Sequence, residues 1–195
     1  MIYWLTSNFF RVISFFIFPM TITGREHIPQ KGPVILASNH VSNLDPFILS
    51  CITTRKISFM AKDSLFKPAW KGFLFRSWHA FPVNRDKADF YAIRESLRRL
   101  KNGEPLLLFP EGTRGVGDRP KEIHAGVGLI VQKMGVPVLP ILIEGSDKVM
   151  PEGSKWFKRG KITIKIGPPL SFSPDGDRIK TARQIVSQIY SLSGK

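Results

Sequence analysis

The sequence predicts an α/β fold with a mostly parallel central sheet flanked by helices. Short apolar runs alternate with helical segments of about 10–14 residues, which is the pattern of strand–helix–strand units. The run at 34–38 is apolar without alternation, as expected for a strand that is buried on both faces. With 195 residues and no fixed-period repeat, the chain suits one well-packed domain.

Local signals place the individual elements. Asp45-Pro46 predicts a helix start, because aspartate suits the N-cap and proline suits the first helical position. The alternating segment KITIKI at 161–166 predicts a half-exposed or edge strand. The expected order is a short strand and polar loop at 21–31, a strand at 34–38, a helix at 47–54, a strand at 57–61, an aromatic helix at 67–78, a strand at 79–83, an amphipathic helix at 88–101, a strand at 105–109, a helix at 126–134, and then strands at 137–143 and 161–166 and a helix at 177–191.

Residues 1–20 form an apolar, aromatic segment ahead of the predicted domain at 21–195. Arg11 lies in its middle, and a charge at the centre of a spanning helix costs about 2.5–3.5 kcal/mol. The segment has neither the basic start nor the cleavage site of a signal peptide. We therefore expect a helix in the membrane interface, which would make the protein peripheral or monotopic at the cytoplasmic face. A buried core helix is the alternative, and a bilayer crossing stays open.

The chain is strongly basic, with 29 Lys and Arg against 15 Asp and Glu and a formal charge of +14. Such a charge predicts a polyanionic partner: an anionic lipid surface, a phosphorylated substrate or nucleic acid. A nucleic-acid-binding module is the less favoured class, because no helix-turn-helix, zinc-finger or aromatic RNA-binding signature is present. The single cysteine, Cys51, excludes an internal disulfide, and no metal or cofactor is expected.

Polar residues follow four of the predicted strands: His40 and Asp45, Lys62, Arg85, and the segment 111–114. Ligand sites of parallel sheets lie beyond the carboxyl ends of the strands, so these residues predict one catalytic edge. His40 and Asp45 suit an acid–base pair in which the carboxylate fixes the imidazole tautomer. The alternative is a structural histidine beside an ordinary capping aspartate.

The motif FPEGTR at 109–114 suits a phosphate. Arg114 supplies a guanidinium fork and Gly112 allows close approach of the backbone. A tight turn with an Arg–Glu ion pair is the alternative.

Four motifs together resemble the glycerolipid acyltransferases, and most closely the 1-acylglycerol-3-phosphate acyltransferases. They are Asn39-His40-x4-Asp45, Arg85 within FPVNRD, the FPEGTR motif, and VPVLP at 136–140. The motifs occur in the order and approximate spacing of the family's blocks, over roughly residues 24 to 170.

The resemblance implies roles for these residues. His40 would be the general base and Asp45 would orient it, for direct attack of a lysolipid hydroxyl on an acyl thioester. The lack of a GxSxG elbow agrees with a mechanism that has no acyl-enzyme. The implied substrate-phosphate site comprises Arg85, Glu111, Gly112, Thr113, Arg114 and Lys62. Val138 and Pro140 would border the acyl-donor site, and Phe66 and Phe73 would line an acyl tunnel, meet the membrane or pack in a core.

The implied substrates are lysophosphatidic acid and either acyl-CoA or an acyl carrier protein. Another lysolipid acceptor, such as lyso-ornithine lipid, is the alternative within the same chemistry. The sequence departs from the family pattern at Trp78-His79-Ala80 and Asn84, where a glycine and an acidic residue are usual, and at His124, where lysine is common. These departures affect the expected headgroup and donor preference.

Overall fold

The computed structural model describes residues 2–84, 89–112, 123, 125–154 and 156–194. In this part of the chain the strands are β1 (Met20–Thr23), β2 (Val34–Ser38), β3 (Ser58–Lys62), β4 (Ala80–Val83), β5 (Pro105–Leu108), β6 (Val138–Glu144) and β7 (Ile162–Ile166). The helices are α1 (Ile2–Ile17), α2 (Asp45–Ser50), α3 (Ala69–Ser77), α4 (Phe90–Lys101), α5 (Ala125–Met134), α6 (Ser146–Val149) and α7 (Arg178–Ser191), with the 3-10 turns η1 (Arg25–His27) and η2 (Asp63–Phe66).

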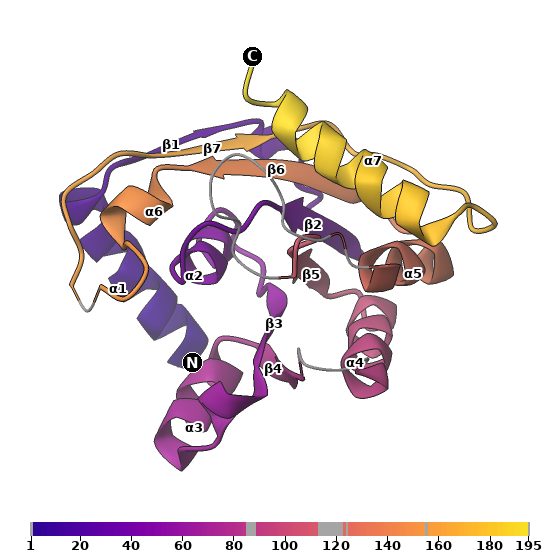
Figure 1. Cartoon of the computed structure of the whole chain (residues 1–195). Coiled ribbons are helices and arrows are strands. Elements are labelled where there is room, and N and C mark those ends of the chain that lie inside the picture. The colour runs from indigo at the N-terminus through magenta and orange to yellow at the C-terminus, as the bar shows by residue number, and fades with distance from the viewer. Residues whose placement is uncertain (1, 85–88, 113–122, 124, 155, 195) are drawn as a thin grey trace.

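The strands form one sheet in the order β1-β7-β6-β2-β5-β3-β4 (Figure 1). Neighbours from β6 through β2, β5 and β3 to β4 are parallel, β7 is antiparallel to β6, and β1 is parallel to β7. The predicted mostly parallel sheet is therefore confirmed. The segment KITIKI becomes β7 with the alternating burial expected of it, but β1 lies outside it, so β7 is not an edge strand.

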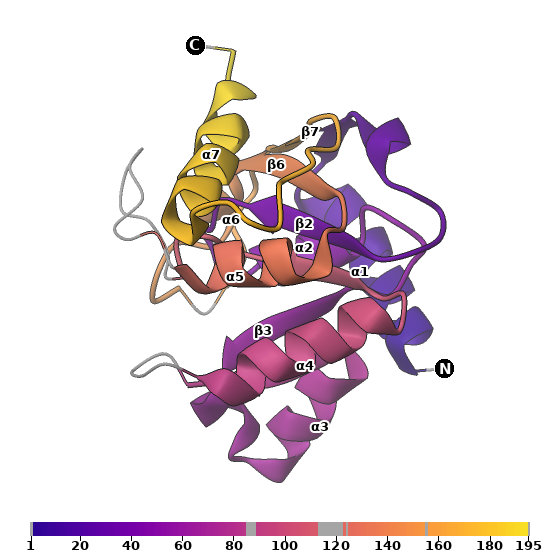
Figure 2. The ribbon, with the colours of Figure 1, turned by 90° about the vertical axis from the view of Figure 1, so that its right-hand side faces the viewer.

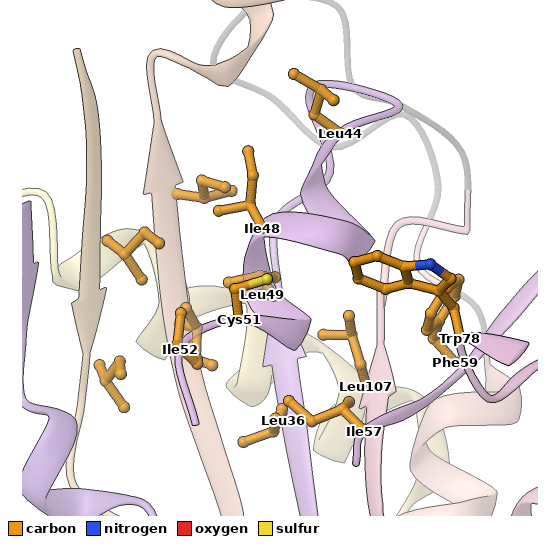
Figure 3. Close-up of a cluster of buried hydrophobic side chains, with 14 of the residues drawn as sticks. Leu36, Leu44, Ile48, Leu49, Cys51, Ile52, Ile57, Phe59, Trp78 and Leu107 are labelled. Atoms are coloured by element: carbon orange, nitrogen blue, oxygen red, sulfur yellow. The ribbon is translucent and has the colours of Figure 1, made fainter. Parts of the chain in front are cut away.

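Helices cover both faces of the sheet, and each face has its own apolar core. Along β2, Val34 and Leu36 join one core while Ile35 and Ala37 join the other, which is why this strand lacks a polar alternation. Figure 3 shows the first core, where Leu36 and Leu107 of the sheet meet Ile48 and Leu49 of α2. Helices α4, α5 and α7 cover the second core (Figure 2).

Helix α1 packs on the domain with one face and exposes apolar side chains on the other. Tyr3 is buried and its hydroxyl donates to the carbonyl of Ser50. On the outer face the exposed fractions of Leu5, Val12 and Phe16 are 71%, 59% and 70%. The alternative of a buried core helix therefore describes only the face of α1 that packs on the domain. Among the described residues, no helix has the length and apolar character that a bilayer crossing requires.

Candidate active site

The carboxyl ends of four parallel strands bring the predicted site residues to one edge of the sheet. His40 follows β2, the turn 109–112 follows β5, and Lys62 ends β3, where it lies opposite Val83 of β4. The described members of the predicted set, His40, Lys62 and the turn 109–112, therefore share an edge. Three predicted phosphate ligands, Arg85, Thr113 and Arg114, lie outside the described residues.

The Asp45 carboxylate accepts four hydrogen bonds. Oδ2 accepts from Nδ1 of His40 at 2.9 Å and from the backbone N–H groups of Val41 and Ser42 at 2.8 Å each. Oδ1 accepts from the hydroxyl of Ser146 at 2.6 Å. The side chain is fully buried, so these donors replace the water that an ionised carboxylate needs.

The prediction that Asp45 is the N-cap of the following helix was wrong. Helix α2 begins at Asp45 itself, Leu44 takes the N-cap position, and no side chain caps the helix. The carboxylate instead turns back to the two N–H groups of the loop that holds His40. The helix also ends at Ser50, four residues before the expected end at 54. The correction strengthens the pairing, because the carboxylate fixes the backbone of the loop as well as the ring.

His40 is held in one tautomer. A carboxylate only accepts hydrogen bonds, so Nδ1 of His40 carries the proton that Asp45 accepts, and Nε2 keeps a free lone pair. His40 is 5% exposed, and its imidazole stacks on the ring of Phe109, with 4.1 Å between the ring centroids. A fixed imidazole with a basic Nε2 at the end of a buried strand is equipped to take a proton from a substrate.

Asn39 fixes the end of β2 from the other side. Its buried side-chain amide donates to the carbonyl of Ile143 at 2.9 Å and accepts from the N–H of Ile143 at 2.8 Å. This double contact ties the mouth of β2 to β6. The position of the backbone just before His40 is thereby fixed relative to β6.

Sequence reasoning missed Ser146. This serine lies 101 residues after Asp45 and is buried just beyond the end of β6, at the start of α6. Its position after a buried strand of the same sheet was the available signal. Nothing in the spacing indicated that its hydroxyl would reach Asp45.

Glu111 is buried behind the turn that follows β5. The residue is 1% exposed, and its Oε1 accepts a hydrogen bond from the hydroxyl of Tyr190 in α7 at 2.5 Å. Oε2 is buried and has no hydrogen-bond partner among the described residues. Burial raises the pKa of Glu111, and the nearby carboxylate of Asp45 raises it further. The hydrogen bond from Tyr190 and the backbone of His40 act in the opposite direction. The positive φ of 64° at Gly112 suits glycine at the end of this turn.

The other predicted residues occupy different environments. Lys62 is exposed at the site edge, whereas Val138 and Pro140 are buried in β6. Phe66 is half-buried and its ring lies 5.6 Å from that of Phe75. Phe73 is 61% exposed on the outside of α3, a placement that suits a membrane contact better than the lining of a tunnel.

The departures from the family pattern have structural counterparts. His79 has a φ of 62° in the left-handed region, where glycine is the residue without strain. Its ring meets the edge of Tyr3 of α1 at 5.6 Å, as Trp78 does at 5.8 Å. These two side chains thus help to seat α1. Asn84 lies at the site edge after β4, and His124 is outside the described residues.

Comparison with known proteins agrees with this geometry. The family model described as Acyltransferase matches residues 19–144. The chain belongs to the acyltransferase family. It is therefore an acyltransferase, and its matched region runs from just before β1 to the end of β6, which includes His40, Asp45 and Glu111.

Several curated relatives are named as 1-acyl-sn-glycerol-3-phosphate acyltransferases. A 1-acyl-sn-glycerol-3-phosphate acyltransferase of Bacillus subtilis is 30% identical over 86% of this chain and 84% of its own length. A protein of the same description from Chlamydomonas reinhardtii is 31% identical over 87% of this chain, and LPAT1, chloroplastic, of Arabidopsis thaliana is 27% identical over 90%. The chain spans about half the length of these last two, 52% and 50%.

A solved structure has the same fold. The crystal structure of the 1-acyl-sn-glycerophosphate (LPA) acyltransferase PlsC from Thermotoga maritima matches with a TM-score of 0.73 at 28% identity. The match covers 90% of this chain and 73% of that one. The α/β sheet and its flanking helices are thus those of a known acyltransferase.

Proposed function

We propose that this acyltransferase moves a fatty acyl group from an acyl thioester to the free 2-hydroxyl of 1-acylglycerol-3-phosphate, giving phosphatidic acid for phospholipid synthesis. The observation that carries the proposal is the buried His40–Asp45 pair, in which four donors hold the carboxylate and Nε2 of the imidazole is left basic. The relatives described above as 1-acyl-sn-glycerol-3-phosphate acyltransferases suggest the acceptor.

The reaction needs one base and no covalent intermediate on the protein. Nε2 of His40 takes the proton from the acceptor hydroxyl while the hydroxyl oxygen attacks the carbonyl carbon of the thioester. The C–O bond forms, the tetrahedral intermediate collapses, and the C–S bond breaks. The imidazolium then returns the proton to the leaving thiolate, so that a thiol is released. Asp45 stabilises the imidazolium through its contact with Nδ1.

The acceptor's phosphate would be held at the edge shared by β5, β3 and β4. Arg85 and Arg114 are the proposed guanidinium ligands, with Thr113 and the backbone at Gly112 beside them and Lys62 as a further cation. Lys62 is exposed at the end of β3 and therefore accessible to a ligand. The buried Glu111 shapes the turn instead of meeting the phosphate.

The donor is proposed to be acyl-CoA or an acyl carrier protein, at a site bordered by the β6 residues Val138 and Pro140. The proposed setting is the cytoplasmic face of the membrane. The exposed apolar face of α1 would lie in the interface, and the charge of +14 would attract anionic lipid.

A panel of acceptors tests the proposal. The purified protein is given lysophosphatidic acid, lyso-ornithine lipid and lysophosphatidylcholine, each with a long-chain acyl-CoA and with an acyl carrier protein thioester. Transfer to lysophosphatidic acid at the highest kcat/KM supports the proposal. Preference for another lysolipid keeps the His40 chemistry and rejects the acceptor. If none of the three acceptors is acylated, the proposal is contradicted.

A further inference from the structure

The C-terminal helix α7 contacts the catalytic edge through the side chain of Tyr190. Tyr190 lies in the last turn of α7 and donates its hydroxyl to Oε1 of Glu111, 79 residues earlier in the chain, at 2.5 Å. We propose that Tyr190 is a positioning residue, which holds Glu111 and thereby fixes the turn 109–112 against His40. This inference rests on the proposed function, since it concerns the same base.

The contact is not needed to hold α7 on the sheet. That helix buries Ile185 and Ile189 in the second core and also buries Ala182, which supplies an apolar anchor independent of the hydroxyl. Tyr190 itself is half-buried, and its ring packs against the same core. Removing only the hydroxyl oxygen therefore leaves the packing of α7 on the sheet unchanged.

The contact matters for the carboxyl of Glu111. A buried carboxylate without donors is costly, and Oε2 has no partner among the residues described, so Tyr190 supplies the hydrogen bond at the other oxygen. This bond favours the ionised form of Glu111, against the burial that raises its pKa. Without the hydroxyl, Glu111 loses this donor, which favours its neutral form or a displaced side chain.

A displaced Glu111 would disturb the base. The residue lies two positions after Phe109, whose ring stacks on the imidazole of His40 at 4.1 Å between centroids, and the backbone of His40 acts on the carboxyl of Glu111. The path from α7 to the base thus runs from the hydroxyl of Tyr190 through Glu111 and the turn to the imidazole face. The path ends at the face of the base, whereas the proposed phosphate neighbour Gly112 lies at the far end of the turn. We therefore expect the main effect on turnover and a smaller effect on acceptor binding.

The test is Tyr190→Phe, with Tyr91→Phe as the matched control because Tyr91 is 60% exposed on α4. We expect Tyr190→Phe to lower kcat about tenfold, to change KM for lysophosphatidic acid less than roughly twofold, and to leave the melting curve cooperative. In the background Glu111→Ala, adding Tyr190→Phe should lower kcat no further. A kcat within about twofold of wild type, or effects that multiply, would overturn the proposal.

Proton NMR of the imidazoles gives a second readout that does not depend on the substrate. The chain has four histidines, and His40→Ala assigns the signal of His40. Tyr190→Phe should shift this signal, because the stacked Phe109 ring moves, and should leave that of His27 in place. An unchanged His40 signal contradicts the inference even if the acceptor has been wrongly chosen. A shifted signal supports it, even if wild type fails to acylate lysophosphatidic acid.

Discussion

Asp45 carries more of the site than its motif suggests. It orients the imidazole, ties down the loop between β2 and α2 through two backbone N–H groups, and meets α6 through Ser146. A single carboxylate thus joins three segments around the base. The motif spacing of five residues reflects this geometry, because the loop must curl far enough for Oδ2 to meet both the ring and the backbone.

Asp45→Asn should lower kcat at least about 100-fold. Both oxygens of Asp45 accept hydrogen bonds, whereas an amide has only one acceptor oxygen. The NH2 group of the substituted side chain would therefore face one of the present donors, and the tautomer of His40 would no longer be fixed. Steady-state acyl transfer at saturating substrate measures the effect, with circular dichroism to confirm folding. A folded Asp45→Asn protein with kcat near that of wild type would remove Asp45 from the mechanism.

Ser146→Ala tests the contact that sequence reasoning missed. Loss of the 2.6 Å hydrogen bond to Oδ1 should lower kcat roughly 3- to 10-fold, because Asp45 keeps its other donors. Ser187→Ala on the exposed face of α7 is the matched control. If Ser146→Ala and Ser187→Ala have equal kcat values, the hydroxyl of Ser146 does not support the base.

At the scale of the elements, the junction of β2 with β6 places the base. Asn39→Ala removes both side-chain contacts to the backbone of Ile143 and leaves a buried donor and acceptor unpaired. We expect the free energy of unfolding to fall by about 2–4 kcal/mol. Urea denaturation followed by fluorescence measures it. A loss below about 0.5 kcal/mol would mean that water or relaxation replaces the amide.

The outer face of α1 has its own test. Leu5→Gln with Phe16→Gln removes two exposed apolar side chains without touching the buried face of the helix. Partitioning onto phosphatidylglycerol vesicles should weaken at least about tenfold, since each apolar side chain contributes about 1.5–3 kcal/mol when buried. Phe90→Gln, at a residue 78% exposed on α4, is the control. Equal partitioning of all three proteins would argue against α1 as the membrane contact.

Across the whole molecule, the sequence predicts what depends on local pattern and parallel topology. The buried strand at 34–38, the run of parallel strands and the shared edge of His40, Lys62 and the FPEG turn all follow from such patterns. Contacts that depend on the register of distant elements do not. Ser146 meets Asp45 because of where β6 ends against β2, and Tyr190 meets Glu111 because of how α7 crosses the second face.

The error at Asp45 has the same origin. An aspartate before a proline resembles an N-cap locally, but the tertiary demand for a carboxylate facing His40 turns the side chain toward the preceding loop. Local propensity yields here to a functional arrangement.

The role of Nε2 of His40 as the base of acyl transfer is tested most directly by one comparison. Transfer from a long-chain acyl thioester to lysophosphatidic acid is measured for wild type, His40→Ala and His27→Ala. His27 is the control because its Nδ1 contacts the backbone carbonyl of Ile166 in β7 and not Asp45. We expect product from wild type and His27→Ala, and a rate at least about 100-fold lower from a folded His40→Ala protein. Equal rates for wild type and His40→Ala would contradict this role.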